Sequence, residues 1–166
     1  LQYLLLKGTQ SEYLLLLHDK KSPQLAEGIK WGKELMGLLN PEKLETAVAV
    51  FRSNPMAGIV CRKEALCQLS LFGESYHFGR HNKGLILSEA KRYDILPNNY
   101  DYVAGTMFLT RTKPFLAFFE KYNAIDIRGH LESGNVLDHE RATHTHAWER
   151  LLCWIMTAQG YTIETV

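Results

Sequence analysis

The residues best suited to chemistry lie near the end of the chain, in the run THTHAWERLLCWIMTAQGYTI. Its apolar residues repeat with a period of 3.6, which predicts a helix with one packing face and one charged face. The charged face carries His146, Glu149 and Arg150, which are a candidate base, acid and cation. Alternatively, Glu149 and Arg150 form only a local ion pair on a solvated face. The two faces are Trp148, Leu151, Leu152 and Ile155 for packing, and His146, Glu149, Arg150 and Thr157 for charge.

A second polar group follows the short apolar run Tyr13 to Leu17. Flanked by turn residues, this run predicts a buried central parallel strand. Ser22-Pro23 then predicts the start of a helix that extends to about residue 39. A helix N-terminus at the carboxyl end of a strand is an anion site, which favours phosphate binding. Alternatively, Lys20 and Lys21 are only solvated charges of a loop. The polar residues at this point are His18, Asp19, Lys20, Lys21 and Ser22.

The run DYVAGTMFLTR, from Asp101 to Arg111, predicts one buried strand. A glycine inside a strand usually marks a close approach by a ligand or by another backbone. Gly105 and Thr106 are therefore candidates for a close approach by a ligand, and tight strand packing is the alternative explanation.

A polar stretch from Asn123 to Thr145 is longer than a simple connection, and loops of this length are often functional. Its His-x-Glu and His-x-His spacings could converge on a divalent ion. However, such spacings are common in polar loops, and no HExxH signature is present. We therefore do not favour a metal site. The residues concerned are His130, Glu132, Asp138, His139, Glu140, His144 and His146.

The elements that would position these residues form an α/β pattern. Asn40-Pro41-Glu42 predicts a capped helix that runs to about Asn54, and Met56 to Cys61 predicts a short buried strand. Further helices are expected at about residues 82–93 and after Thr112. A strand, two helices and a strand predict a mostly parallel sheet flanked by helices.

The composition sets broad limits. The chain has 166 residues, which suits a single domain, and a net charge of +1, which gives no support for nucleic-acid binding. The cysteines are Cys61, Cys67 and Cys153; with no CxxC pair, they favour a reducing compartment over disulfides or structural zinc. No apolar run reaches membrane-spanning length. Because the chain begins at Leu1 inside an apolar segment, we expect it to be a piece of a longer polypeptide.

Four strings in order, LLLLHDKKS, FRSNPMAGIV, VAGTMFLTR and HAWERL with a closing GYTI, resemble the rhamnan synthesis protein F family of glycosyltransferases. The resemblance extends from about Ser11 to Ile163, and the family's upstream nucleotide-binding part is missing. It implies a GT-A-like α/β fold that binds a nucleotide sugar at the carboxyl edge of the sheet. Where many such folds carry Asp-x-Asp, this chain has His18-Asp19-Lys20, so we expect cations rather than a required metal to neutralise the diphosphate.

The resemblance also implies roles for the site residues. Glu149 would be the base that deprotonates the acceptor hydroxyl, with His146 as the alternative base and Arg150 either orienting the carboxylate or reaching a phosphate. His18, Asp19, Lys20, Lys21 and Ser22 would bind the donor phosphates. The residues expected to bind substrate are Trp31, Gly105, Thr106, Met107 and Glu132.

The sequence thus predicts a glycosyltransferase that moves a sugar, with L-rhamnose as the leading candidate, from a nucleotide diphosphate to a cell-surface glycan or a lipid-linked glycan. We expect no required cofactor and a cytoplasmic location or the inner face of the membrane, with peripheral attachment through the full-length protein as an option. Two alternatives remain open. One is a metal-dependent hydrolase that uses the His130–His146 cluster, and the other is a non-catalytic domain that binds carbohydrate or a protein partner.

Overall fold

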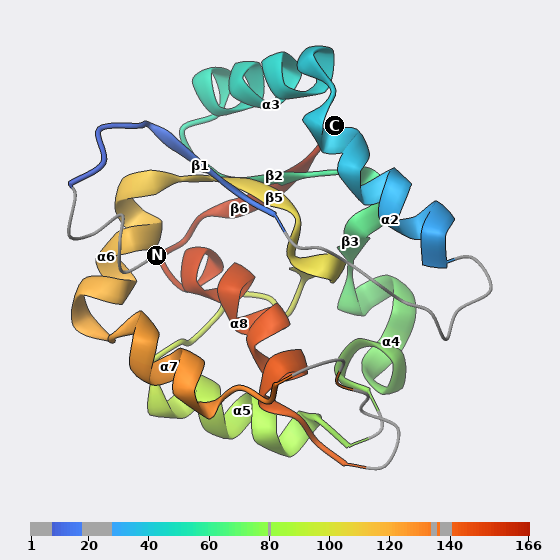
Figure 1. Ribbon diagram of the computed structural model, residues 1–166, viewed down its shortest axis with the longest axis vertical. Coiled ribbons are helices and arrows are strands. Elements are labelled where there is room, and N and C mark those ends of the chain that lie inside the picture. Colours follow the sequence, from blue (N-terminus) through green and yellow to red (C-terminus); the bar gives the residue numbers. More distant parts are fainter. Residues whose placement is uncertain (1–7, 18–27, 80, 134–135, 137–140) are drawn as a thin grey trace.

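A computed structural model describes residues 8–17, 28–79, 81–133, 136 and 141–166. The fold has three layers, with a four-stranded sheet in the middle (Figure 1). Helix α3 covers one face of the sheet, and α8 and α6 cover the other. Helices α5 and α7 lie beyond α8, so that α8 runs through the interior of the molecule.

The sheet is mixed rather than mostly parallel. Its order is β1-β5-β2-β6; β5 is antiparallel to both neighbours, and only β2 and β6 pair in parallel. The expectation that Tyr13 to Leu17 forms a central parallel strand is therefore wrong, because β1 is an edge strand. The coarser expectation of an α/β fold with helices flanking a sheet is confirmed.

Helix α3 and strand β2 follow the local chemistry of their sequence. The Asn40 side chain accepts a hydrogen bond from the Glu42 backbone N–H at 2.9 Å, and Pro41 occupies the first turn, where its missing N–H costs nothing. Every residue of β2 is buried. Its side chains alternate between the two faces, so that Val60 packs under α3 while Ile59 packs on the α8 side.

Two stretches differ from expectation. The run from Asp101 to Arg111 is not one strand: the short β4 gives way to the 3₁₀ turn η3 before β5 begins. The cause is the backbone of η3, where Gly105 and Thr106 both have positive φ and cannot continue a strand. The polar stretch after Asn123 is not wholly a loop, because it contains helix α7, which the Asn123 side chain caps through the Ile125 N–H.

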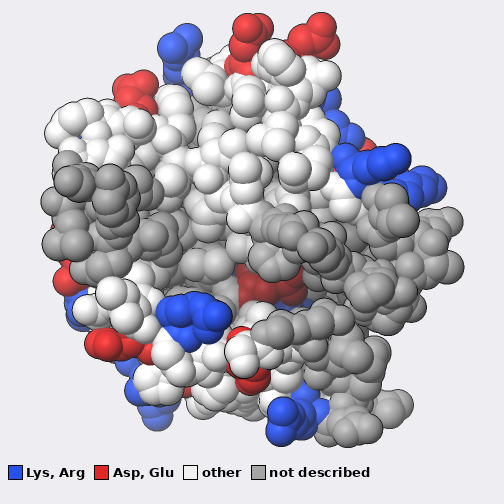
Figure 2. Space-filling model, in the orientation of Figure 1, with Lys and Arg blue, Asp and Glu red and all other residues white. Residues whose placement is uncertain are grey.

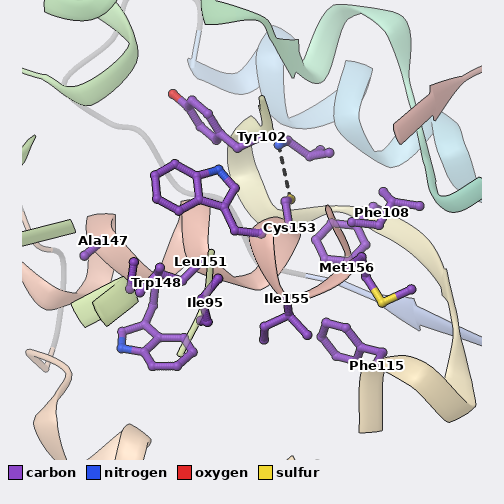
Figure 3. Packing of buried hydrophobic residues seen from close by; sticks show 14 of the residues in the cluster. Ile95, Tyr102, Phe108, Phe115, Ala147, Trp148, Leu151, Cys153, Ile155 and Met156 are labelled. Atoms are coloured by element: carbon purple, nitrogen blue, oxygen red, sulfur yellow. Dashed lines mark hydrogen bonds between the residues drawn. The ribbon is translucent and has the colours of Figure 1, made fainter. Parts of the chain in front are cut away.

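Helix α8 is the core helix of the domain. Its residues pack on the aromatic side chains of β5 and α6, as Figure 3 shows for Phe108 and Phe115. In the same view the Val103 N–H donates to the Cys153 sulfur at 3.3 Å, which ties β4 to α8. Two residues of the expected charged face are buried, since Arg150 is only 5% exposed and Thr157 is 1% exposed, so the alternative of an ion pair on a solvated face does not hold for Arg150. The main buried residues of α8 are Ala147, Trp148, Leu151, Cys153, Trp154, Ile155 and Met156.

None of the helices in the described part of the chain is long and apolar enough to cross a membrane. The strands are β1 Tyr13–Leu16, β2 Ala57–Cys61, β3 Leu66–Cys67, β4 Tyr102–Val103, β5 Phe108–Arg111 and β6 Thr162–Thr165. The helices are α2 Gly28–Met36, α3 Pro41–Ser53, α4 Leu69–Phe78, α5 Lys83–Arg92, α6 Thr112–Lys121, α7 Ala124–His130 and α8 His144–Thr157, with 3₁₀ turns η1 Gly37–Leu39, η2 Lys63–Ala65 and η3 Ala104–Thr106.

Candidate functional site

The carboxylate of Glu149 lies where α8 meets η3, and both of its oxygens are held. Oε1 accepts a hydrogen bond from the Gly105 backbone N–H at 2.7 Å, and Oε2 accepts one from Arg150 Nη1 at 2.8 Å. The side chain is 16% exposed, so the group is partly open to solvent. A carboxylate offers about four acceptor positions, and these two contacts leave acceptor capacity on each oxygen. The geometry therefore fixes the direction of the carboxylate without saturating it.

Gly105 reaches Glu149 because of its unusual backbone. Its φ is +79°, and a Cβ built on it would lie 2.6 Å from a methyl carbon of Leu35 in α2. Any other residue would thus be strained, and its Cβ would push against the Leu35 side chain. The next residue, Thr106, also has a positive φ of 56° although it is β-branched, and it is half-buried. Strained residues of this kind persist where the surroundings fix them, often at functional sites.

Arg150 uses every N–H of its guanidinium inside the protein. Nε and Nη2 donate to the His77 carbonyl at 3.2 and 3.1 Å, and Nη2 also donates to the Tyr102 hydroxyl at 3.1 Å. Nη1 donates to the His146 carbonyl and to Glu149, both at 2.8 Å. A guanidinium has five donors, and these contacts engage all five. Two roles were expected for Arg150, namely orienting the Glu149 carboxylate or reaching a phosphate. Because all five donors are engaged and one of them holds Glu149, the contacts favour the first role.

His146 lies one turn before Glu149 and is half-buried. Its Nδ1 is 2.7 Å from the Thr143 hydroxyl, and Thr143 is the N-cap of α8. The ring is thereby fixed at the start of the helix, and His146 stays the alternative base.

Glu132 caps the same helix end. Its carboxylate accepts from the backbone N–H groups of His144 and Thr145, at 2.8 and 2.9 Å, and from the Thr145 hydroxyl at 2.8 Å. Burial alone would raise the pKa of Glu132, but the hydrogen bonds from Thr145 and His144 outweigh it and lower the pKa to about 2. Since both oxygens are used to hold α8, the structure gives Glu132 a capping role.

The other predicted residues fall into two groups. Met107 is 2% exposed and packs in the main core, so the structure gives it a packing role. Trp31 belongs to α2, but its side chain lies outside the described part of the structure. The proposed phosphate-binding residues His18, Asp19, Lys20, Lys21 and Ser22 also lie outside the described residues.

Within the described residues, no three His, Cys, Asp or Glu side chains are grouped so that they could hold a metal ion. His130 contacts the Asp126 carbonyl through Nδ1 at 2.7 Å, and Glu132 is engaged with α8. His144 Nδ1 is 3.8 Å from the buried carboxylate of Glu89. The residues Asp138, His139 and Glu140 of the alternative metal cluster lie outside the described residues.

Sequence reasoning missed the groups that support this site. His77 was given no role, yet its carbonyl receives two hydrogen bonds from Arg150. Burial lowers the pKa of His77, and its Nε2 contacts the Tyr100 carbonyl, so the ring is a neutral Nε2–H donor. Tyr102 was read only as part of a strand. No local spacing could have found these groups, because they meet Arg150 across 73 and 48 residues of chain.

One face of the molecule is hollowed near its centre (Figure 2). Figure 2 shows carboxylate side chains recessed near the centre of the face, over the region where α8 lies in Figure 1. Glu149 is a residue of α8 and is partly exposed. An acidic recess suits hydroxyl groups, which donate hydrogen bonds to carboxylates, better than it suits phosphates.

Comparison with known proteins gives a limited result. The chain is 26% identical over 158 residues to the uncharacterized protein WxcX of Xanthomonas campestris pv. campestris strain ATCC 33913, and 25% identical to WxcX of strain B100. Each match covers 93% of this chain but 21% of the relative, so the chain spans about a fifth of the length of these curated relatives. No protein family and no solved structure matches the chain.

Proposed function

We propose that this chain is a glycosyltransferase domain of the rhamnan synthesis protein F type, with a GT-A-like fold, that transfers a sugar from a nucleoside diphosphate to a glycan acceptor. The observation that carries the proposal is the Glu149 carboxylate, which is held at both oxygens, keeps acceptor capacity and is partly exposed to solvent. The four strings that resemble the family place the same residue at the start of its late helix. The name of the WxcX relatives records no activity, so the substrates and partners of the whole protein belong to the proposal.

The proposed reaction is a single displacement. Glu149 takes the proton of an acceptor hydroxyl as that oxygen attacks the anomeric carbon. The bond from this carbon to the diphosphate oxygen breaks, and the nucleoside diphosphate leaves with the bonding electron pair. A β-linked donor therefore gives an inverted product. L-rhamnose is the proposed sugar, and a cell-surface or lipid-linked glycan is the proposed acceptor.

The diphosphate requires positive charge, and Arg150 has no N–H to offer it. We assign this task to Lys20 and Lys21 with the helix that follows them, by the chemistry of their sequence. A divalent metal is not required in this proposal. Among the described residues, no observation favours the metal-dependent hydrolase.

Calorimetric titration tests the proposal. The chain is titrated with nucleoside diphosphates and their rhamnose derivatives, with and without EDTA, and the titration is repeated on Lys20→Ala and Glu149→Ala. We expect binding that survives EDTA, weakens at least tenfold in Lys20→Ala and persists in Glu149→Ala. Binding of a simple glycan without any nucleotide would instead favour a non-catalytic carbohydrate-binding domain.

A further inference from the structure

The guanidinium of Arg150 is fixed by groups from two other elements. The His77 carbonyl, at the end of α4, accepts from two of its nitrogens, and the Tyr102 hydroxyl, from β4, accepts from one. The Tyr102 ring also lies under the guanidinium, with its centroid 4.3 Å from Cζ. A guanidinium is planar, so three contacts on one side determine where its remaining nitrogen points. In this structure that nitrogen, Nη1, points at Glu149 Oε2.

We propose that Tyr102 is a positioning residue for Glu149, acting through Arg150. The expected effect on sugar transfer rests on the proposed function. The positioning of the Glu149 carboxylate does not depend on it. Tyr102 and the His77 carbonyl hold Arg150, Arg150 holds Oε2 of Glu149, and the Gly105 N–H holds Oε1. The result is a carboxylate held from two sides by other groups of the protein.

The burial of Tyr102 fits this role. The residue is 4% exposed, and burial raises the pKa of its hydroxyl, so the oxygen stays protonated and neutral. A neutral hydroxyl accepts from Arg150 Nη2 and keeps its own proton to donate.

The test compares Tyr102→Phe with Tyr122→Phe. Tyr102→Phe keeps the ring under Arg150 and removes the oxygen, whereas the Tyr122 hydroxyl donates to Asp94 at the surface. The first readout is the amide proton resonance of Gly105, which reports the hydrogen bond to Glu149. The second is the split between kcat and KM for sugar transfer from nucleoside diphosphate rhamnose to an alkyl rhamnoside.

We expect Tyr102→Phe to move the Gly105 resonance toward its position in Glu149→Gln and to lower kcat at least tenfold, with KM for the donor within twofold. Tyr122→Phe should change neither readout. Arg150→Lys, which cannot make five hydrogen bonds, should move the same resonance and serves if Tyr102→Phe does not fold.

The inference is overturned if the Gly105 resonance in Tyr102→Phe matches the wild type, whatever happens to kcat. A shifted resonance in a protein whose wild type transfers no sugar would support the positioning of Glu149 and reject the proposed function. The spectra of wild type and Tyr102→Phe therefore test the positioning of Glu149, and the rate of sugar transfer by wild type tests the proposed function.

Discussion

The cap that Glu132 places on α8 should make a measurable, pH-dependent contribution to stability. The substitution is Glu132→Gln, which keeps the size of the side chain but removes its charge and one of its acceptor oxygens. Three donors from the first turn of α8 then lose a charged partner. Because α8 is the core helix, this loss acts on the whole domain and not on a fraying end.

The magnitude follows from the pKa of Glu132, which falls from 4.5 to about 2 on folding. This difference sets a ceiling of about 3 kcal/mol on the stabilisation. The side chain is half-buried, so water screens part of it, and we expect about 1.5 kcal/mol at pH 7. Because the pKa is lowered in the folded state, the contribution is complete above about pH 5 and is lost as the pH falls toward 2. More than half should be gone at pH 3.

The assay is urea unfolding followed by tryptophan fluorescence, because Trp148 and Trp154 are both buried in α8. We expect Glu132→Gln to be less stable than wild type by about 1.5 kcal/mol at pH 7 and by less than about 0.7 kcal/mol at pH 3. Glu45→Gln, an exposed carboxylate in α3, should differ from wild type by less than about 0.5 kcal/mol at either pH. An equal loss at both pH values, or no loss at pH 7, would refute the capping argument.

Three further predictions concern the backbone, a half-buried arginine and a thiol. Gly105→Ala should lower the free energy of unfolding by about 1–3 kcal/mol in the same urea assay, because Gly105 has a positive φ and a Cβ there would meet Leu35 of α2. Its control is Gly84→Ala, at an open position in a helix, which should not lower the free energy of unfolding. Arg111→Ala should cost about 2–3 kcal/mol, because this side chain donates to three carbonyls around the end of α3, and the exposed Arg52→Ala should stay within about 0.5 kcal/mol. Burial raises the pKa of Cys153 to about 12. At pH 8 an aromatic disulfide reagent should therefore label this thiol only as fast as the protein unfolds. Rapid labelling of Cys153 in the folded protein would contradict its burial.

Elements with local signals could be predicted from the sequence. The cap at Asn40 with Pro41 fixes the start of α3, and the continuous apolar run of β2 fits its complete burial. The helical period around Glu149 gave α8, because a 3.6-residue pattern needs no knowledge of the rest of the chain.

Features that depend on distant residues could not be predicted. Strand β5 lies between β1 and β2 and runs opposite to both, and the order of strands is set by pairing across the chain, not by any one strand's sequence. The burial of Arg150 could not be predicted, because a helical wheel cannot show that distant carbonyl and hydroxyl groups will satisfy a buried guanidinium. Gly105 was visible as an anomaly, but the approaching group is the Glu149 carboxylate of the protein itself.

The most direct test of the proposed function is the rate of nucleoside diphosphate release from its rhamnose derivative with an alkyl rhamnoside as acceptor, measured for wild type and Glu149→Gln. Removing a general base costs about 10²–10⁴-fold in rate, so we predict at least a 100-fold loss of kcat with donor affinity within threefold of wild type. If the variant turns over as fast as wild type, or if it loses donor binding along with activity, then Glu149 is not the base and the account of this site is contradicted.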